Sequence, residues 1–133
     1  MTLTDRRPTM VEIAPLLVVA EIYRSLDFYC RQLGFKITNS YAPHGKLCWC
    51  RVERDSTAIM LQLACEQDGP ASGRGRGVTF YLTCDDTDAI CAEFRAAGLD
   101  VEPPQVTFYG MNQLFVKDPD GYVLCFQNDA ERR

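Results

Sequence analysis

The sequence has no excess of positive charge and no long apolar run. Its formal charge is -4 at pH 7 and its pI is about 4.9, without the basic stripe typical of a nucleic-acid-binding protein. The longest apolar run, residues 14–20, falls far short of the roughly 18 residues that a membrane-spanning helix needs. The N-terminal residues lack the apolar core of a secretory signal peptide. We therefore expect a cytoplasmic protein with no nucleic-acid partner and no membrane partner.

A disulfide framework is not expected either. The seven cysteines are an odd number in a chain without a secretory signal, so they are better explained as small buried apolar residues. Hydrophobic residues make up 47% and charged residues 24% of the 133 residues, which is ordinary globular composition at the length of about one domain. The sequence therefore predicts one domain over residues 1–133 with a real hydrophobic core.

The chain contains an internal repeat with an offset of about 65 residues. Asp55 corresponds to Asp120, and residues 58–62 correspond to residues 123–127. We expect module one at about residues 10–65, a glycine-rich connector at residues 66–77 and module two at about residues 78–128. The Gly-Arg-Gly-Arg-Gly stretch of the connector precedes a strand pattern rather than a helix, which argues against a phosphate-binding loop.

Each module is predicted to run strand, helix and three strands. In module one we expect a strand at residues 11–19, a helix at 22–33, and strands near 35–41, 46–53 and 57–63. In module two we expect a strand at residues 78–84, a helix that begins at the N-cap Asp86 and runs to Ala97, and strands near 99–108, 112–117 and 122–127. Residues 118–121, Asp-Pro-Asp-Gly, predict the turn between the last two strands.

Side chains alternate across a strand, so each predicted strand has a helix-facing side and an opposite side. In module one, hairpin pairing sets Trp49 and Arg51 beside Met60, and turns Cys48 and Cys50 toward the helix. In module two, a two-residue turn at residues 119–120 predicts that Asn112, Leu114 and Val116 share a face with Val123, Cys125 and Gln127. The opposite side then carries Trp49, Arg51, Met60, Gln62, Thr79, Tyr81, Asn112, Leu114, Cys125 and Gln127. Apolar walls with a few polar groups are typical of a small-molecule pocket, although a partly solvated sheet face or a dimer interface would have the same composition.

A family resemblance rests on residues 25–29 (Ser-Leu-Asp-Phe-Tyr), 33–35 (Leu-Gly-Phe), 85–86 (Asp-Asp), 96–98 (Ala-Ala-Gly) and 118–121 (Asp-Pro-Asp-Gly). In this order they resemble the glyoxalase/bleomycin-resistance/dioxygenase superfamily, also called the vicinal oxygen chelate superfamily. The resemblance implies an α+β fold of two βαβββ modules in a pseudo-twofold repeat, with curved mixed sheets around a cavity. It also implies a homodimer.

Metal enzymes of this superfamily carry His, Glu or Gln ligands on the cavity-facing strands. The resemblance maps these positions near Ala14, Met60, Thr79 and Cys125, none of which is His, Glu or Asp. The single histidine, His44, lies in a loop between strands and cannot build a site alone, and Gln62 with Gln127 would offer only two neutral oxygens.

This departure resembles the metal-free bleomycin-resistance branch, whose members bind a bulky cationic drug without chemistry. It implies no metal, no cofactor and no catalytic residue, and aromatic walls from Trp49, Tyr81, Tyr109 and the neighbouring Met111. Arg51 could instead hold a carboxylate. The leading hypothesis is therefore a metal-independent protein that sequesters a small molecule of unknown identity in a cavity at the dimer.

Two other hypotheses remain open. The chain could be a superfamily enzyme, a glyoxalase-like lyase or isomerase or a dioxygenase-like relative, with an atypical or lost metal site. Proton transfer would then fall to Glu53, His44 or Tyr81. A third hypothesis is a degenerate cavity domain that is kept for oligomer contacts.

Overall fold

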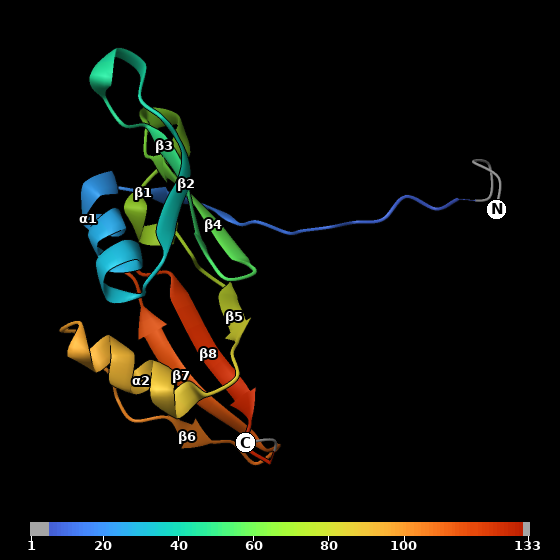
Figure 1. The fold of residues 1–133 in the computed structure, drawn as a ribbon. Coiled ribbons are helices and arrows are strands. Elements are labelled where there is room, and N and C mark those ends of the chain that lie inside the picture. The colour runs from blue at the N-terminus through green and yellow to red at the C-terminus, as the bar shows by residue number, and fades with distance from the viewer. Residues whose placement is uncertain (1–5, 132–133) are drawn as a thin grey trace.

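The computed structural model describes residues 6–131 and contains two four-stranded mixed sheets. The strand order is β1-β4-β3-β2 in the first sheet and β5-β8-β7-β6 in the second. Figure 1 shows α1 beside the first sheet and α2 beside the second. The predicted α+β fold of two repeated modules is confirmed.

The two modules use the same order of elements. The first contains β1 (Leu16–Val19), α1 (Ile22–Leu26), β2 (Lys36–Tyr41), β3 (Trp49–Arg54) and β4 (Thr57–Leu63), and α1 continues as a π-helical stretch over Asp27–Gln32. The second contains β5 (Thr79–Thr83), α2 (Thr87–Ala96), β6 (Gln105–Val106), β7 (Met111–Lys117) and β8 (Val123–Asp129). Three single 3₁₀ turns lie at Pro43–Gly45, Glu66–Asp68 and Ala71–Gly73.

Each sheet has one parallel pair, and the connection between its two strands contains the helix and the other two strands of the module. β1 pairs with β4 so that Leu16 lies opposite Met60, and β5 pairs with β8 so that Tyr81 lies opposite Cys125. A parallel pair needs such a crossover because a tight turn joins only antiparallel strands. Asp86 caps α2 by accepting a hydrogen bond from the Ala89 N–H at 3.0 Å, as the sequence predicted.

The helix-facing sides of both sheets share one hydrophobic core. Its fully buried members include Leu17, Val19, Tyr29, Leu33, Cys50, Val52, Leu61, Phe94 and Leu124. Polar contacts also join the modules, because the Tyr122 hydroxyl donates to the Val18 carbonyl at 2.8 Å and Arg54 pairs with Glu93. The side of each sheet away from the helices, which we call its open face, is covered by neither α1 nor α2.

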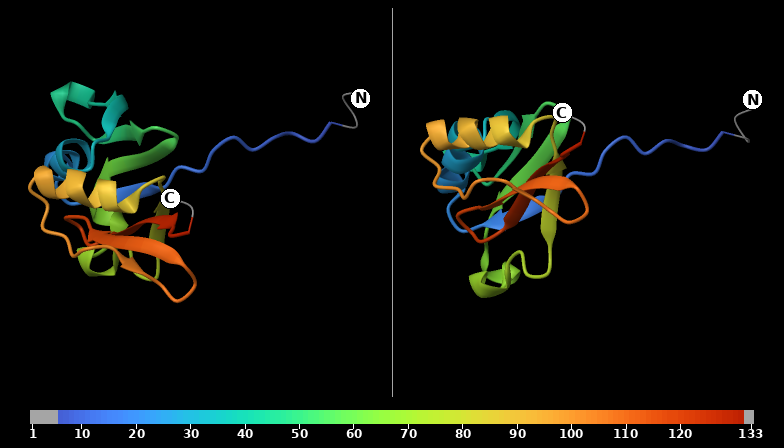
Figure 2. Two further views of the ribbon diagram at one scale, coloured as in Figure 1. Left: turned by 60° about the horizontal axis from the view of Figure 1, so that its bottom comes forward. Right: turned by 90° about the horizontal axis from the view of Figure 1, so that it is seen from below.

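Two predicted strands are shorter in the structure. Residues 11–15 form no strand, and β1 begins at Leu16. The backbone hydrogen bond next to the start of β1 runs from the Met60 N–H to the Pro15 carbonyl. Residues 6–15 instead form an extended N-terminal arm that leaves the body of the molecule in every view (Figure 2). On this arm Met10, Val11 and Ile13 are more than nine-tenths exposed.

The strand expected over residues 99–108 is reduced to β6, Gln105–Val106. Pro103 and Pro104 have no backbone N–H to donate to a neighbouring strand, which explains why pairing starts only after them. No helix within residues 6–131 is both long and apolar enough to cross a membrane.

Candidate functional site

The open face of the first sheet carries the four side chains that the sequence predicted for it. In the β3–β4 register, Trp49 lies opposite Gln62 and Arg51 lies opposite Met60. The turn between these strands has two residues, because Arg54 still pairs with Thr57. All four side chains are half-buried rather than fully exposed. The predicted arrangement of Trp49, Arg51, Met60 and Gln62 on one face is confirmed.

A charge network crosses this face. The Arg51 guanidinium contacts two carboxylates: Nη2 pairs with Glu12 of the N-terminal arm, and Nε donates to Glu53 Oε2 at 2.8 Å. The Thr38 hydroxyl donates to the same Glu53 oxygen at 2.7 Å. The hydrogen bond from Thr38 lowers the pKa of Glu53 most, and the hydrogen bond from Arg51 lowers it next most. The carboxylates of Glu12 and Glu53 in turn raise the pKa of Arg51. Arg51 is therefore not an unpaired cation.

The second open face follows a register that the sequence did not predict. In β7–β8, Phe115 lies opposite Cys125, Gln113 lies opposite Gln127 and Met111 lies opposite Asp129. Thr79 and Tyr81 of β5 join this face through their parallel pairing with Val123 and Cys125. Of the predicted site residues, the open face of the second sheet thus holds Thr79, Tyr81, Met111 and Cys125.

The predicted face of Asn112 and Leu114 is wrong. Asn112 is 2% exposed, pairs with Asn128, and its amide donates to Asp88 of α2 at 3.1 Å, so it lies on the helix side. Leu114 is 1% exposed, belongs to the hydrophobic core and lies opposite Phe126. Val116 is likewise in the core, opposite Leu124.

The length of the β7–β8 turn explains why the side chains of β7 lie on the face opposite to the predicted one. The Asp118 N–H donates to the Tyr122 carbonyl at 2.8 Å, which leaves three loop residues instead of two. Gly121, the last of them, has a φ of 94°, and a three-residue hairpin loop commonly ends in a residue of this left-handed kind. One additional loop residue moves every side chain of β7 to the other face.

The corrected register brings Gln113 and Phe115, which the sequence analysis missed, onto the open face. The signal for them was present in the sequence, because a glycine at the fourth position of Asp-Pro-Asp-Gly favours the three-residue loop. Gln113 donates through Nε2 to the Gln127 side-chain oxygen at 3.0 Å and to the Tyr109 hydroxyl at 3.1 Å. Tyr109 is thereby held next to the sheet, although it belongs to the β6–β7 turn.

The residues at the family's metal-ligand positions do not form a donor set for a hard divalent metal. Cys125 is 0% exposed, and burial raises the pKa of its thiol to about 11, which disfavours the thiolate that metals bind. Ala14, Met60 and Thr79 offer no imidazole or carboxylate. His44 is exposed at the tip of the β2–β3 turn, with a φ of 55°. Within residues 6–131, no three His, Cys, Asp or Glu side chains gather as a metal site would require.

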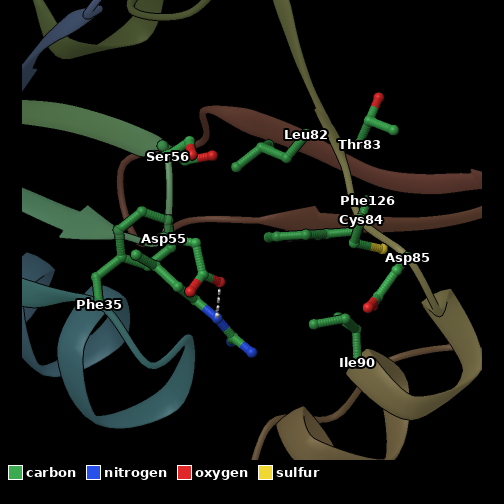
Figure 3. A pocket seen from close by; sticks show the side chains of 11 residues that line it. Phe35, Asp55, Ser56, Leu82, Thr83, Cys84, Asp85, Ile90 and Phe126 are labelled. Atoms are coloured by element: carbon green, nitrogen blue, oxygen red, sulfur yellow. Dashed lines mark ion pairs between the residues drawn. The ribbon is translucent and has the colours of Figure 1, made fainter.

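Two cavities lie where the modules meet. One, of about 360 Å³, is lined by Ile13, Pro15, Ser56, Thr57, Ala58, Ile59, Thr79, Phe80, Tyr81 and Leu82. The other, of about 340 Å³, is lined by residues that include Phe35, Arg54, Asp55, Cys84, Asp85 and Ile90 (Figure 3). Thr79 and Tyr81 border the first of them, but Trp49, Arg51 and Cys125 border neither. A single chain therefore presents most of the predicted site residues, though not Asn112, on two separate open faces.

Comparison with known proteins agrees with this architecture. The family model of the Glyoxalase/Bleomycin resistance protein/Dioxygenase superfamily matches residues 9–126. No curated protein matches the chain in sequence.

Several solved structures share the fold. An antibiotic binding protein from a Streptomyces species is 24% identical, with a TM-score of 0.67 over 90% of this chain and 97% of that one. A bleomycin resistance determinant encoded on the transposon Tn5 is 18% identical, with a TM-score of 0.72 over 89% and 97%. A bleomycin-binding protein from Streptomyces verticillus, complexed with copper(II)-bleomycin, is 16% identical, with a TM-score of 0.70 over 90% and 97%. At these identities the likeness concerns the fold.

Proposed function

Because the chain belongs to the Glyoxalase/Bleomycin resistance protein/Dioxygenase superfamily, we propose that it binds a small molecule and sequesters it without chemical change. The binding cavity would form between two copies of the chain, with the open face of the first sheet of one copy against the open face of the second sheet of the other. A bleomycin resistance determinant and a bleomycin-binding protein among the structures of the same fold support this branch of the superfamily.

The composition of the two open faces supports the proposal. Each combines aromatic or apolar side chains with a few polar groups, which is the composition of a small-molecule site. The first offers Trp49, Met60 and Gln62, and the second offers Tyr81, Gln113 and Gln127. The single observation that supports the proposal most is that this mixed composition recurs on both sheets, on the side that neither helix covers.

A second copy explains side chains that a single chain leaves exposed. Tyr41 is 61% exposed, Tyr81 55%, Phe115 52% and Leu16 43%, and all four lie on the open faces. Met10, Val11 and Ile13 of the N-terminal arm are exposed as well, and exposed apolar side chains that lie together are typical of a protein–protein interaction surface. Covering both faces at once requires a partner with two matching faces, which a twofold-related copy supplies.

Sequestration rather than metal chemistry follows from the donor set. The four positions at which superfamily enzymes carry ligands hold Ala14, Met60, Thr79 and the buried thiol of Cys125. Such side chains suit the wall of a cavity, and they would hold no iron, zinc or nickel ion in the usual way.

Bleomycin titration of protein purified without a histidine tag tests the proposal. Trp49 is the only tryptophan, so its fluorescence reports binding at the open face of the first sheet. We expect saturable quenching at micromolar bleomycin, weakened in Tyr81→Ala and unchanged in Tyr23→Ala, which alters an exposed residue of α1. The proposal would be contradicted if bleomycin caused no quenching of Trp49 and no measurable heat of binding. One bound metal equivalent per chain, with turnover, would favour a superfamily enzyme.

A further inference from the structure

Three side chains on the second open face form a neutral hydrogen-bonded cluster, which we call the amide platform: Tyr109, Gln113 and Gln127. The Gln113 nitrogen Nε2 lies 3.0 Å from Gln127 Oε1 and 3.1 Å from the Tyr109 hydroxyl. Gln113 is 7% exposed, whereas Gln127 is half-buried and Tyr109 is 57% exposed. The platform thus has a buried centre and two reachable ends.

The platform leaves one amide donor and one amide acceptor for a ligand. Within residues 6–131, Gln113 Oε1 and Gln127 Nε2 make no other hydrogen bond, and neither is a fully buried unpaired atom. Exchanging oxygen and nitrogen in both amides preserves the network, and it again leaves one donor and one acceptor. The platform therefore matches a group that presents an acceptor beside a donor.

The backbone holds the platform in place. Tyr109 lies in the β6–β7 turn, which is closed by bonds from the Gly110 N–H to the Thr107 carbonyl at 3.0 Å and from the Met111 N–H to Thr107 Oγ1 at 3.0 Å. The Phe108 ring meets the Tyr109 ring edge-on, with centroids 5.0 Å apart. A site whose side chains are already ordered loses less conformational entropy when a ligand binds.

The surroundings favour a neutral, flat ligand group. Phe115 follows Gln113 by two residues on β7, Tyr81 lies opposite Cys125 on the next strand, and both rings are about half exposed. Lys117 is four residues from Gln113, about 13 Å along the strand. The Asp129 carboxylate accepts a hydrogen bond from the Glu131 N–H at 3.0 Å, so it already has a backbone partner.

We propose that the amide platform binds the donor–acceptor edge of a planar carboxamide or lactam in the ligand, while Phe115 and Tyr81 contact its flat body. This inference rests on the proposed function and names the chemical group that the second open face selects. The charged network of Arg51 lies on the other sheet, where Glu12 and Glu53 already pair with the guanidinium. The platform itself therefore needs no ionic contact.

Three naphthalene probes of nearly equal shape test the choice of group. 2-Naphthamide presents a carbonyl and an N–H₂ group, methyl 2-naphthoate lacks the donor, and 2-naphthoate carries a negative charge. We expect 2-naphthamide to bind about tenfold more tightly than either of the others, the difference that one good hydrogen bond makes. Side-chain amide resonances of Gln113 and Gln127 in ¹H–¹⁵N spectra should shift on titration with 2-naphthamide.

Substitutions then locate the site. Gln127→Met should raise the Kd for 2-naphthamide and the Kd for methyl 2-naphthoate by about tenfold each, because it removes the Nε2 donor to the carbonyl that both probes carry. Gln127→Met keeps the side-chain length at a half-buried position, so the fold should persist, as circular dichroism would check. Gln32→Met is the matched control, because Gln32 lies in the helical stretch after α1, and it should change neither Kd.

Equal Kd values for the three probes, or an unchanged Kd for 2-naphthamide in Gln127→Met, would overturn the proposed role of the amide platform. If bleomycin still quenches Trp49 in that case, the proposed function stands and only the choice of group is wrong. If 2-naphthamide binds with the expected preference, the platform is supported whatever bleomycin does.

Discussion

The Tyr29 hydroxyl donates a hydrogen bond of 2.8 Å to Asp118 Oδ2, and this bond ties the helical stretch of the first module to the β7–β8 turn of the second. Tyr29 is 0% and Asp118 4% exposed, so neither group reaches water. Burial raises the pKa of the Asp118 carboxyl, whereas the Tyr29 hydroxyl and the backbone N–H groups of Asp120 and Tyr122 partly offset that rise. The turn that sets the register of the second open face is thus held by the first module.

Removing this hydroxyl should destabilise the whole chain. We expect Tyr29→Phe to lower the free energy of unfolding by about 1–3 kcal/mol, because a buried acceptor loses its partner. Tyr23→Phe, at a residue of α1 that is 68% exposed, is the matched control and should change stability little. Urea denaturation of both variants measures the difference. Equal midpoints would mean that the bond between the modules contributes nothing.

The β7–β8 loop needs glycine at its last position. Gly121 has a φ of 94°, which costs an L-residue about 1–2 kcal/mol, and no heavy atom outside residues 120–122 lies within 4 Å of the position that an added Cβ would take. We therefore expect Gly121→Ala to lower stability by about 1–2 kcal/mol through backbone strain alone. Gly73→Ala, in the connector, has equal space without a positive φ and should be nearly neutral. A Gly121→Ala protein as stable as Gly73→Ala would contradict the loop geometry.

The Glu53 carboxyl should titrate below its ordinary value of 4.5, because Thr38 and Arg51 donate to its charged form. A carboxyl whose folded-state pKa is lowered stabilises the fold when ionised, and that contribution disappears as the pH falls through the folded-state pKa. Thr38→Val should raise the pKa of Glu53. Carbon-13 NMR titration of the Glu53 side chain measures the shift, and an unchanged midpoint would refute the role of Thr38.

The cysteines should differ sharply in reactivity. Cys65 is exposed, whereas Cys50, Cys91 and Cys125 are buried, and burial raises the pKa of the Cys50 and Cys125 thiols to about 11. A disulfide reagent such as Ellman's reagent should modify Cys65 rapidly in the native protein and the buried thiols only on unfolding. Cys65→Ser should lack the fast phase. Fast modification of Cys125, located by mass spectrometry, would show that this position carries a reactive thiolate after all.

Much of the architecture could be predicted because the signals were local or repeated. The 65-residue offset and the spacing of apolar residues around Tyr29 indicated the modules and the first helix. Trp49, Arg51 and Met60 were assigned to the right face because the β3–β4 turn has two residues. These inferences needed only strand alternation and one turn length.

The second open face could not be predicted with the same rule. A two-residue turn was assumed where three residues form the loop, so Asn112 took the place that belongs to Gln113. The strand expected over residues 11–19 also failed in part. β4 begins at Thr57 and so extends past Leu16, but Pro15 has no N–H to donate to it, and pairing starts only at Leu16. Pairing depends on tertiary neighbours, which propensity does not contain.

Sedimentation equilibrium on the unmodified chain tests the central claim, that a second copy completes the cavity, most directly. The account predicts a species of twice the 15.0 kDa chain mass at micromolar concentration. A single species of 15.0 kDa over the same concentrations would contradict it, because the two open faces of one chain would then have no partner to close them.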